Sequence, residues 1–298
     1  MFTYETAPNK FIQVGDITYA YRLFGASKGI PLVFMVHFRG TMDHWDPFLI
    51  NPIAATRPIL LYDSAGIGRS NGKVPTTFAG WAQCALDVVT ALKINQIDLF
   101  GFSMGGMAAQ MLVLNNPGLV RRLILAGTQP SIGPETVVNF DAVKMMVEAP
   151  TEENDGLDAF LKTFFAPSEK SQAAGRAYWA RMTGARPNRT GFGDETSTKR
   201  QLAAAGNFFD PEKATDGSYE RLHEIKIPVL VANGSSDVLT PTANSWVLYR
   251  KLPNAHLHLF PDSGHGFLNE YADVFARMVN EFLDKWRFEG EKGPDSRL

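Results

Sequence analysis

The sequence predicts an α/β fold in which a mostly parallel central sheet is flanked by helices. Short apolar runs of strand length alternate with helical patterns along most of the 298 residues, and this alternation is typical of parallel strands covered on both faces. One long segment, residues 129–226, has helical patterns but no apolar run typical of a buried strand. We therefore expect a discontinuous core, residues 1–128 and 227–298, with residues 129–226 inserted as a helical cap.

The core elements follow one another in a regular order. An alternating apolar pattern around Gly15-Asp16 predicts an antiparallel hairpin over residues 11–24. Continuous apolar runs predict buried strands over residues 30–36, 59–62, 123–126, 229–232 and 256–260, and one from residue 97. Apolar residues at helical spacing predict helices over residues 45–55, 77–93, 241–252 and 273–286, with Thr77 as a helix cap.

A serine lies at the sharpest predicted connection between a strand and a helix. The pattern Gly101-x-Ser103-x-Gly105 follows the apolar run from Ile97, and a helical pattern follows the serine. A serine on such a turn has a strained backbone, and the residues two positions away must lack side chains so that strand and helix can pass closely. The helix N-terminus directs backbone N–H groups toward an oxyanion above the serine. The pattern predicts a nucleophile, with a plain turn as the alternative.

A serine nucleophile needs a base that takes its proton and an acid that orients the base. His265 follows the last predicted strand, and its small neighbours leave the imidazole free to reach inward. Asp237 follows the strand over residues 229–232 and is the expected acid, although its turn-rich surroundings also suit a turn residue. Asp262 is the rival acid, but it lies so close to His265 in sequence that we expect it to close the turn instead.

No metal site or cofactor is expected. His256 and His258 share one face of a predicted strand, but no third ligand of matching spacing accompanies them. Cys84 is the only cysteine, which excludes an internal disulfide and a cysteine-based metal site.

These motifs resemble the α/β-hydrolase superfamily, and within it the members whose loop reads His-Phe-Arg-Gly followed by Trp-Asp-Pro, here residues 37–40 and 45–47. A further family mark is Asp63-x-x-Gly66-x-Gly68-x-Ser70, a tight turn that buttresses the site. The similarity covers about residues 11–128 and 227–286. It implies the α/β-hydrolase fold, with Ser103, Asp237 and His265 as the catalytic triad.

The resemblance also implies an oxyanion hole made by the backbone N–H groups of Phe38 and Met104. The loop departs from the usual His-Gly-x-Pro-Gly pattern, because Val36 and His37 stand where the family has histidine and glycine. Arg39 replaces the proline. Its side chain can anchor the loop or bind an anionic group of the substrate, and anchoring is the favoured interpretation.

The predicted cap is rich in aromatic residues and methionine, which suits an irregular apolar surface. We expect part of it to cover an apolar pocket above Ser103; the alternative is that all these side chains pack the cap onto the core. The candidates for substrate contact are Met145, Met146, Phe164, Phe165, Trp179 and Phe208.

The function expected from these residues is that of a cofactor-free serine hydrolase, which cleaves an apolar carboxylic ester or lactone through an acyl-enzyme on Ser103. Hydrolysis of a carbon–carbon bond and perhydrolysis use the same residues and stay open as alternatives, as does a ligand receptor on the same scaffold. Epoxide hydrolysis and haloalkane dehalogenation are disfavoured, because relatives with those activities have aspartate where Ser103 stands.

The expected partner is a small-molecule substrate, with a homodimer left open. A net charge of −2 gives no electrostatic reason to expect binding to nucleic acid or an anionic membrane. No apolar run approaches the roughly 20 residues that a membrane span needs. The N-terminal residues lack the pattern of a signal peptide, so the expected location is the cytoplasm.

Overall fold

The computed structural model describes residues 1–149 and 153–286, and within them one sheet of eight strands in the order β1-β2-β4-β3-β5-β6-β7-β8. Strand β2 is antiparallel to β1 and β4, whereas the other neighbouring pairs are parallel. The predicted fold class and the N-terminal hairpin are confirmed. The strands β1 to β8 span Lys10–Val14, Ile17–Gly25, Leu32–Met35, Pro58–Tyr62, Ile97–Phe102, Val120–Ala126, Val229–Gly234 and Ala255–Phe260.

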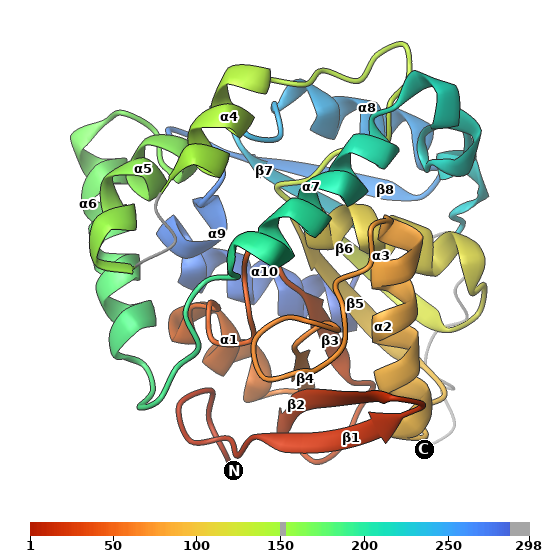
Figure 1. The fold of residues 1–298 in the computed structure, drawn as a ribbon, viewed down its shortest axis with the longest axis vertical. Coiled ribbons are helices and arrows are strands. Elements are labelled where there is room, and N and C mark those ends of the chain that lie inside the picture. Colours follow the sequence, from red (N-terminus) through yellow and green to blue (C-terminus); the bar gives the residue numbers. More distant parts are fainter. Residues whose placement is uncertain (150–152, 287–298) are drawn as a thin grey trace.

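Helices cover both faces of this sheet (Figure 1). Successive side chains of a strand point to opposite faces, so Phe34 and Phe100 pack in one apolar cluster while Val33 and Leu99 pack in another. The first cluster includes side chains of α1 (Pro47–Ala54), α9 (Phe267–Glu270) and α10 (Ala272–Asp284). The second includes side chains of α2 (Phe78–Ala91), α3 (Met104–Asn115) and α8 (Ala243–Lys251).

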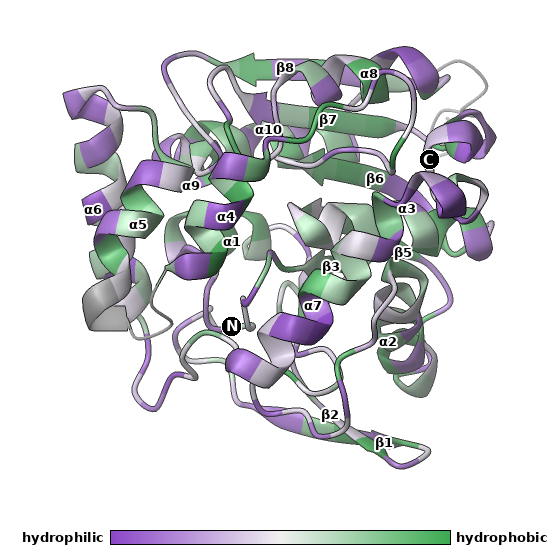
Figure 2. Ribbon diagram, turned by 45° about the horizontal axis from the view of Figure 1, so that its top comes forward, coloured by the Kyte–Doolittle hydropathy of each residue, from purple (hydrophilic) through white to green (hydrophobic). Residues whose placement is uncertain are grey.

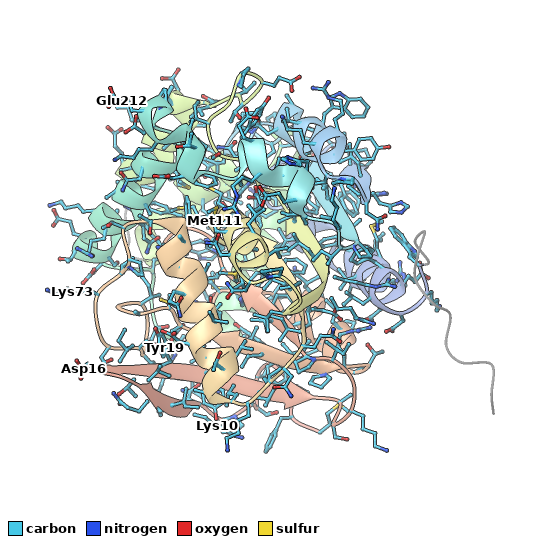
Figure 3. The ribbon with its side chains drawn as sticks, turned by 90° about the vertical axis from the view of Figure 1, so that its right-hand side faces the viewer. Lys10, Asp16, Tyr19, Lys73, Met111 and Glu212 are labelled. Atoms are coloured by element: carbon cyan, nitrogen blue, oxygen red, sulfur yellow. The ribbon has the colours of Figure 1, made fainter. Side chains whose placement is uncertain are left out.

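Local signals explain where these helices begin. The Thr77 hydroxyl accepts a hydrogen bond from the Gly80 N–H and caps α2, as expected. The Asp46 carboxylate caps α1 in the same way, so this helix starts at Pro47 rather than at residue 45. The Tyr19 hydroxyl of β2 (Figure 3) donates to the Asp87 carboxylate of α2 at 2.9 Å. This bond ties the antiparallel edge to the helix.

The segment between β6 and β7, which we call the insert (residues 129–226), is helical in its described part and contains no strand there. Helices α5 (Glu153–Phe164) and α6 (Glu169–Gly184) add side chains to the first apolar cluster, and α7 (Glu195–Phe208) adds side chains to the second. In Figure 2 these helices carry both hydrophilic and hydrophobic residues, whereas β6 and β7 are mainly hydrophobic. The insert comprises α4 (Phe140–Glu148), α5 (Glu153–Phe164), α6 (Glu169–Gly184), α7 (Glu195–Phe208), η1 (Pro211–Asp216) and η2 (Tyr219–Glu224).

The division of the chain into core and cap domains stays a prediction, and its parts at residues 150–152 and 287–298 lie outside the described residues. Among the residues that the structure does describe, no helix is both long and apolar enough to cross a bilayer.

Candidate active site

Ser103 lies between β5 and α3 with φ 56° and ψ −124°, a conformation that a residue with a side chain rarely adopts. Its surroundings explain the glycines of the motif. A Cβ atom on Gly101 would lie 2.6 Å from the Cα of Gly106, and one on Gly105 would lie 2.1 Å from the carbonyl oxygen of Met35. The crowding inferred from the motif is therefore present on both sides of the serine.

His265 and Asp237 form a buried pair, with Nδ1 of His265 2.7 Å from Oδ2 of Asp237. The other carboxylate oxygen accepts the N–H groups of Leu239 and Thr240 at 2.8 and 3.0 Å, and the Thr240 hydroxyl donates to Oδ2 at 2.7 Å. Because an ionised carboxylate only accepts hydrogen bonds, this pairing assigns the imidazole proton to Nδ1. Nε2 is then the nitrogen available to act as a base.

The ring of His265 is held between two aromatic side chains. Phe102, the residue before the nucleophile, stacks on it with centroids 4.9 Å apart, and Phe164 of the insert meets it edge-on at 4.9 Å. Among the described residues Nε2 has no hydrogen-bond partner. The Gly266 N–H donates to the Phe164 carbonyl at 2.6 Å, and a Cβ on Gly264 would lie 2.8 Å from that same oxygen. The small neighbours of His265 thus let the end of α5 pack against its loop.

The rival acid lies elsewhere. Asp262 has a left-handed backbone with φ 47°, is exposed, and accepts a hydrogen bond from the Ser168 hydroxyl at 2.8 Å. Asp262 lies in the turn after β8, as expected, but its carboxylate binds Ser168 of the insert and not His265. The described residues contain no group of three or more His, Cys, Asp or Glu side chains that could hold a metal ion.

The loop after β3 carries the two residues that depart from the family pattern. The Gly40 N–H donates to the His37 carbonyl at 3.0 Å, and Nδ1 of His37 donates to the Phe38 carbonyl at 2.8 Å. Burial lowers the pKa of His37 to about 4, so the imidazole is neutral at pH 7. His37 thus braces its own loop. Among the described residues, the backbone N–H groups of Phe38 and Met104 have no protein acceptor.

The turn at Asp63 connects this loop to the one after β4. The Asp63 carboxylate accepts the N–H groups of Met42 at 2.7 Å and Arg69 at 2.9 Å. Burial raises its pKa to about 6. A Cβ on Gly68 would lie 2.3 Å from the carboxylate, which explains the second glycine of this motif.

Arg39 binds the insert. Its guanidinium donates to the backbone carbonyls of Met146, Val147 and Ala149 at 3.3, 2.8 and 3.1 Å. These carbonyls lie at the C-terminus of α4, where the helix dipole favours a positive charge. Nε donates to the Thr198 hydroxyl of α7 at 3.0 Å. This geometry supports anchoring, because all three nitrogens of the guanidinium donate to the insert. Arg39 also lines a small cavity of about 50 Å³ there.

A cavity of about 220 Å³ borders Ser103, and Phe38 and Met104 line it as well. The insert covers it with apolar side chains, Phe140 and Met146 among them. Ser103, Gln129 and Thr240 supply the polar side chains among the described residues that line this cavity, and no charged side chain belongs to that set. The space next to the serine is therefore apolar.

Of the predicted substrate contacts, some line the cavity beside Ser103 or its neighbour, and the others lie elsewhere. Met146 lines the cavity beside Ser103, and it also lines a neighbouring cavity of about 50 Å³ together with Phe164 and Trp179. Met145 lines neither of these cavities and is 46% exposed, so its predicted place in the pocket is wrong. Successive residues of a helix point about 100° apart, so of these two methionines it is Met146 that α4 turns toward the core.

Phe165 and Phe208 also lie away from the serine cavity. Phe165 is buried where a Cβ on Gly175 or Gly266 would meet its ring at 2.7 Å. Phe208 packs edge-on against Phe78 of α2 at 4.8 Å and lines a separate cavity. Both side chains pack the insert onto the core, which is the alternative to a place in the substrate pocket.

Sequence reasoning missed most of the residues that cover the cavity. Phe140 and Val143 precede the predicted Met146 at three-residue spacing along α4, and Leu202 and Ala205 of α7 are followed at helical spacing by Phe209, the residue after that helix. These two apolar stripes were the available signal. Gln129 and Thr240 were also missed, since neither belongs to a motif.

Comparison with known proteins decides the family. Residues 31–270 match the family model of the alpha/beta hydrolase fold. This chain belongs to the α/β-hydrolase family. It is also similar to a solved alpha/beta hydrolase fold protein from Chitinophaga pinensis, with 32% identity and a TM-score of 0.85 over 96% of this chain and 100% of the other.

Two curated relatives are hydrolases. The chain is 29% identical to 2-hydroxy-6-oxononadienedioate/2-hydroxy-6-oxononatrienedioate hydrolase 1 of Dechloromonas aromatica, over 94% of this chain and 96% of the relative. It is 30% identical to the 2-hydroxymuconate semialdehyde hydrolase of Pseudomonas sp. strain CF600, over 88% and 89% of the two chains. The family and these relatives together show that this chain is a hydrolase.

Proposed function

We propose that this α/β-hydrolase cleaves an uncharged, apolar carboxylic ester or lactone through an acyl-enzyme on Ser103. The observation that supports this most is the cavity beside Ser103, whose described lining is apolar and carries no charged side chain. Burying an uncharged acyl chain in such a space is favourable, whereas burying an unpaired carboxylate there is unfavourable.

In the proposed reaction, Oγ of Ser103 attacks the substrate carbonyl while Nε2 of His265 takes its proton. Asp237 stabilises the imidazolium through Nδ1, and the N–H groups of Phe38 and Met104 bind the oxyanion. The tetrahedral intermediate collapses, and the imidazolium gives its proton to the departing alkoxide. Water then attacks the acyl-enzyme with His265 again as base, which releases the carboxylic acid and restores Ser103.

The names of the relatives favour a second candidate, hydrolysis of a carbon–carbon bond. The name of the Dechloromonas relative specifies a substrate with two carboxylate groups. A dianion would need cationic side chains beside the serine, because burying an unpaired carboxylate is costly. Arg39 directs its guanidinium to carbonyls of α4. The lining therefore favours the uncharged ester or lactone.

A substrate panel tests this proposal. We expect kcat/KM to rise from acetyl to octanoyl esters of 4-nitrophenol, about fourfold per methylene until the cavity is full. Apolar lactones should also be hydrolysed, and the 2-hydroxy-6-oxononadienedioate ring-fission product should be a poor substrate. Turnover of the dioate with no hydrolysis of esters or lactones would favour the carbon–carbon hydrolase. A single turnover without a steady state would instead favour the receptor.

A further inference from the structure

Gln129 follows β6 and is one of the polar residues that line the cavity beside Ser103. Only 3% of its surface is exposed. Its backbone carbonyl accepts a hydrogen bond from Nε2 of Gln110 at 3.0 Å, so the main chain is fixed by α3. A buried amide in an apolar space is costly unless its polar atoms are satisfied, and this raises the question of what its two ends bind.

The hydrogen bonds of neighbouring residues determine which end faces the cavity. The backbone N–H of Val137 can only donate, and it donates to the Asn244 side chain at 2.8 Å, so the accepting atom is Oδ1. The Nδ2 group of Asn244 therefore points the other way and donates to the Val137 carbonyl at 2.7 Å and to the Gln129 side chain at 2.6 Å. The Gln129 atom that accepts is Oε1.

Nε2 is then the end of the Gln129 amide that is left for the cavity. Among the described residues it has no hydrogen-bond partner, and it is not fully buried, because the Gln129 side chain borders the cavity. The other polar lining residues have tasks of their own. The Thr240 hydroxyl donates to Asp237, and Ser103 is the proposed nucleophile.

From this geometry we infer that Gln129 is a specificity residue whose Nε2–H group binds a second acceptor oxygen of the substrate. The inference rests on the proposed function and narrows it to esters or lactones that carry a further carbonyl oxygen, such as keto esters. A purely hydrocarbon chain would displace water from Nε2 and leave the donor unpaired. A site built to donate a hydrogen bond discriminates against the analogue that lacks the acceptor.

The test compares ligands that differ only in the extra oxygen. The acyl probes are ethyl hexanoate and its 3-oxo, 4-oxo and 5-oxo derivatives, and the alcohol-side probes are pentyl butanoate and 4-oxopentyl butanoate. Dissociation constants are measured by calorimetry on the Ser103→Ala variant, so that no turnover is needed. We expect at least one keto ligand to bind about three- to tenfold more tightly than its hydrocarbon parent.

The Gln129→Met change in the same background keeps the length of the side chain and removes its donor. It should abolish the keto advantage while the parent esters bind as well as before or better. As a matched control, Val143→Ala enlarges the cavity without touching the amide and should change both kinds of ligand alike. The inference is overturned if no keto ligand binds more tightly than its parent, or if the advantage survives in Gln129→Met. Turnover of ethyl hexanoate by the wild-type enzyme tests the proposed function separately.

Discussion

Nδ1 of His265 lies 2.7 Å from Oδ2 of Asp237, with both side chains fully buried. A hydrogen bond between an imidazole and a carboxylate is stronger in such surroundings than in water. It fixes the ring so that Nε2 is free of protein partners among the described residues. The loss of this hydrogen bond should therefore impair catalysis by Ser103.

Asp237→Asn should lower kcat by a factor on the order of 10⁴, because an amide can hold the wrong tautomer of His265, as in a comparable triad. Steady-state kinetics with an apolar 4-nitrophenyl ester measure the loss. Asp262→Asn is the matched control and should stay within a few-fold of wild type, since its carboxylate binds Ser168 at the surface. The opposite ranking of the two variants would make Asp262 the acid.

Thr240→Val should lower kcat about tenfold and leave KM nearly unchanged, because it removes the hydroxyl that donates to Oδ2 of Asp237. The hydroxyl positions the Asp237 carboxylate, whereas valine keeps the shape of the threonine side chain, so the cavity that binds the substrate should change little. Thr240→Ser keeps the hydroxyl and should restore most of kcat. If valine and serine behave alike in the kinetic assay, the hydroxyl has no positioning role.

The unfolding free energy should depend on pH through His37. Its pKa is about 4 in the folded protein and near 6.5 when unfolded. Between these values the unfolded chain takes up a proton that the folded protein does not, so stability falls as pH falls, by about 3 kcal/mol from pH 7 to pH 4. Urea unfolding of wild type and His37→Gln across this range measures the effect.

The variant comparison is needed because Asp63 acts in the opposite direction. Its pKa is raised to about 6, so its contribution to stability is present below the unfolded value and is lost as pH rises toward 6. His37→Gln should flatten the acid-side loss of stability relative to wild type. Parallel curves for the two proteins would contradict the assigned pKa of His37.

Arg39→Met should reduce the preference for octanoyl over acetyl esters several-fold and lower Tm. The change removes the three hydrogen bonds that hold the C-terminus of α4, which carries Met146 over the cavity. Arg39→Lys retains the charge and should retain part of the preference. If the ratio of kcat/KM values is unchanged in Arg39→Met while Tm falls, Arg39 only stabilises the fold.

The sequence predicted the features that local physical constraints impose. A serine with positive φ needs glycines beside it, so Gly101 and Gly105 identified the turn at Ser103 before any tertiary contact was known. The succession of strands and helices along the chain, and the helices on both faces of the sheet, followed from apolar periodicity, whereas the order of the strands within the sheet was not predicted. The roles of Ser103, Asp237 and His265 in the reaction stay predictions that the geometry supports.

The rotation of the insert helices could not be predicted, because tertiary contacts set it. Met145 and Met146 are equally apolar, so their composition does not tell which one faces the cavity. In the structure Arg39 binds the end of α4, and Met146 lines the cavity while Met145 is exposed. The orientation of the Gln129 amide likewise depends on Asn244, which lies far along the chain. No spacing in the sequence encodes either contact.

Covalent labelling with an alkyl fluorophosphonate, followed by peptide mass spectrometry, tests whether Ser103 is the nucleophile. We expect one adduct on the peptide that contains Ser103 and loss of ester turnover in proportion to labelling. Ser103→Ala should show neither labelling nor turnover, with an unchanged circular dichroism spectrum. An adduct on another serine, or ester hydrolysis that persists in Ser103→Ala, would contradict this assignment.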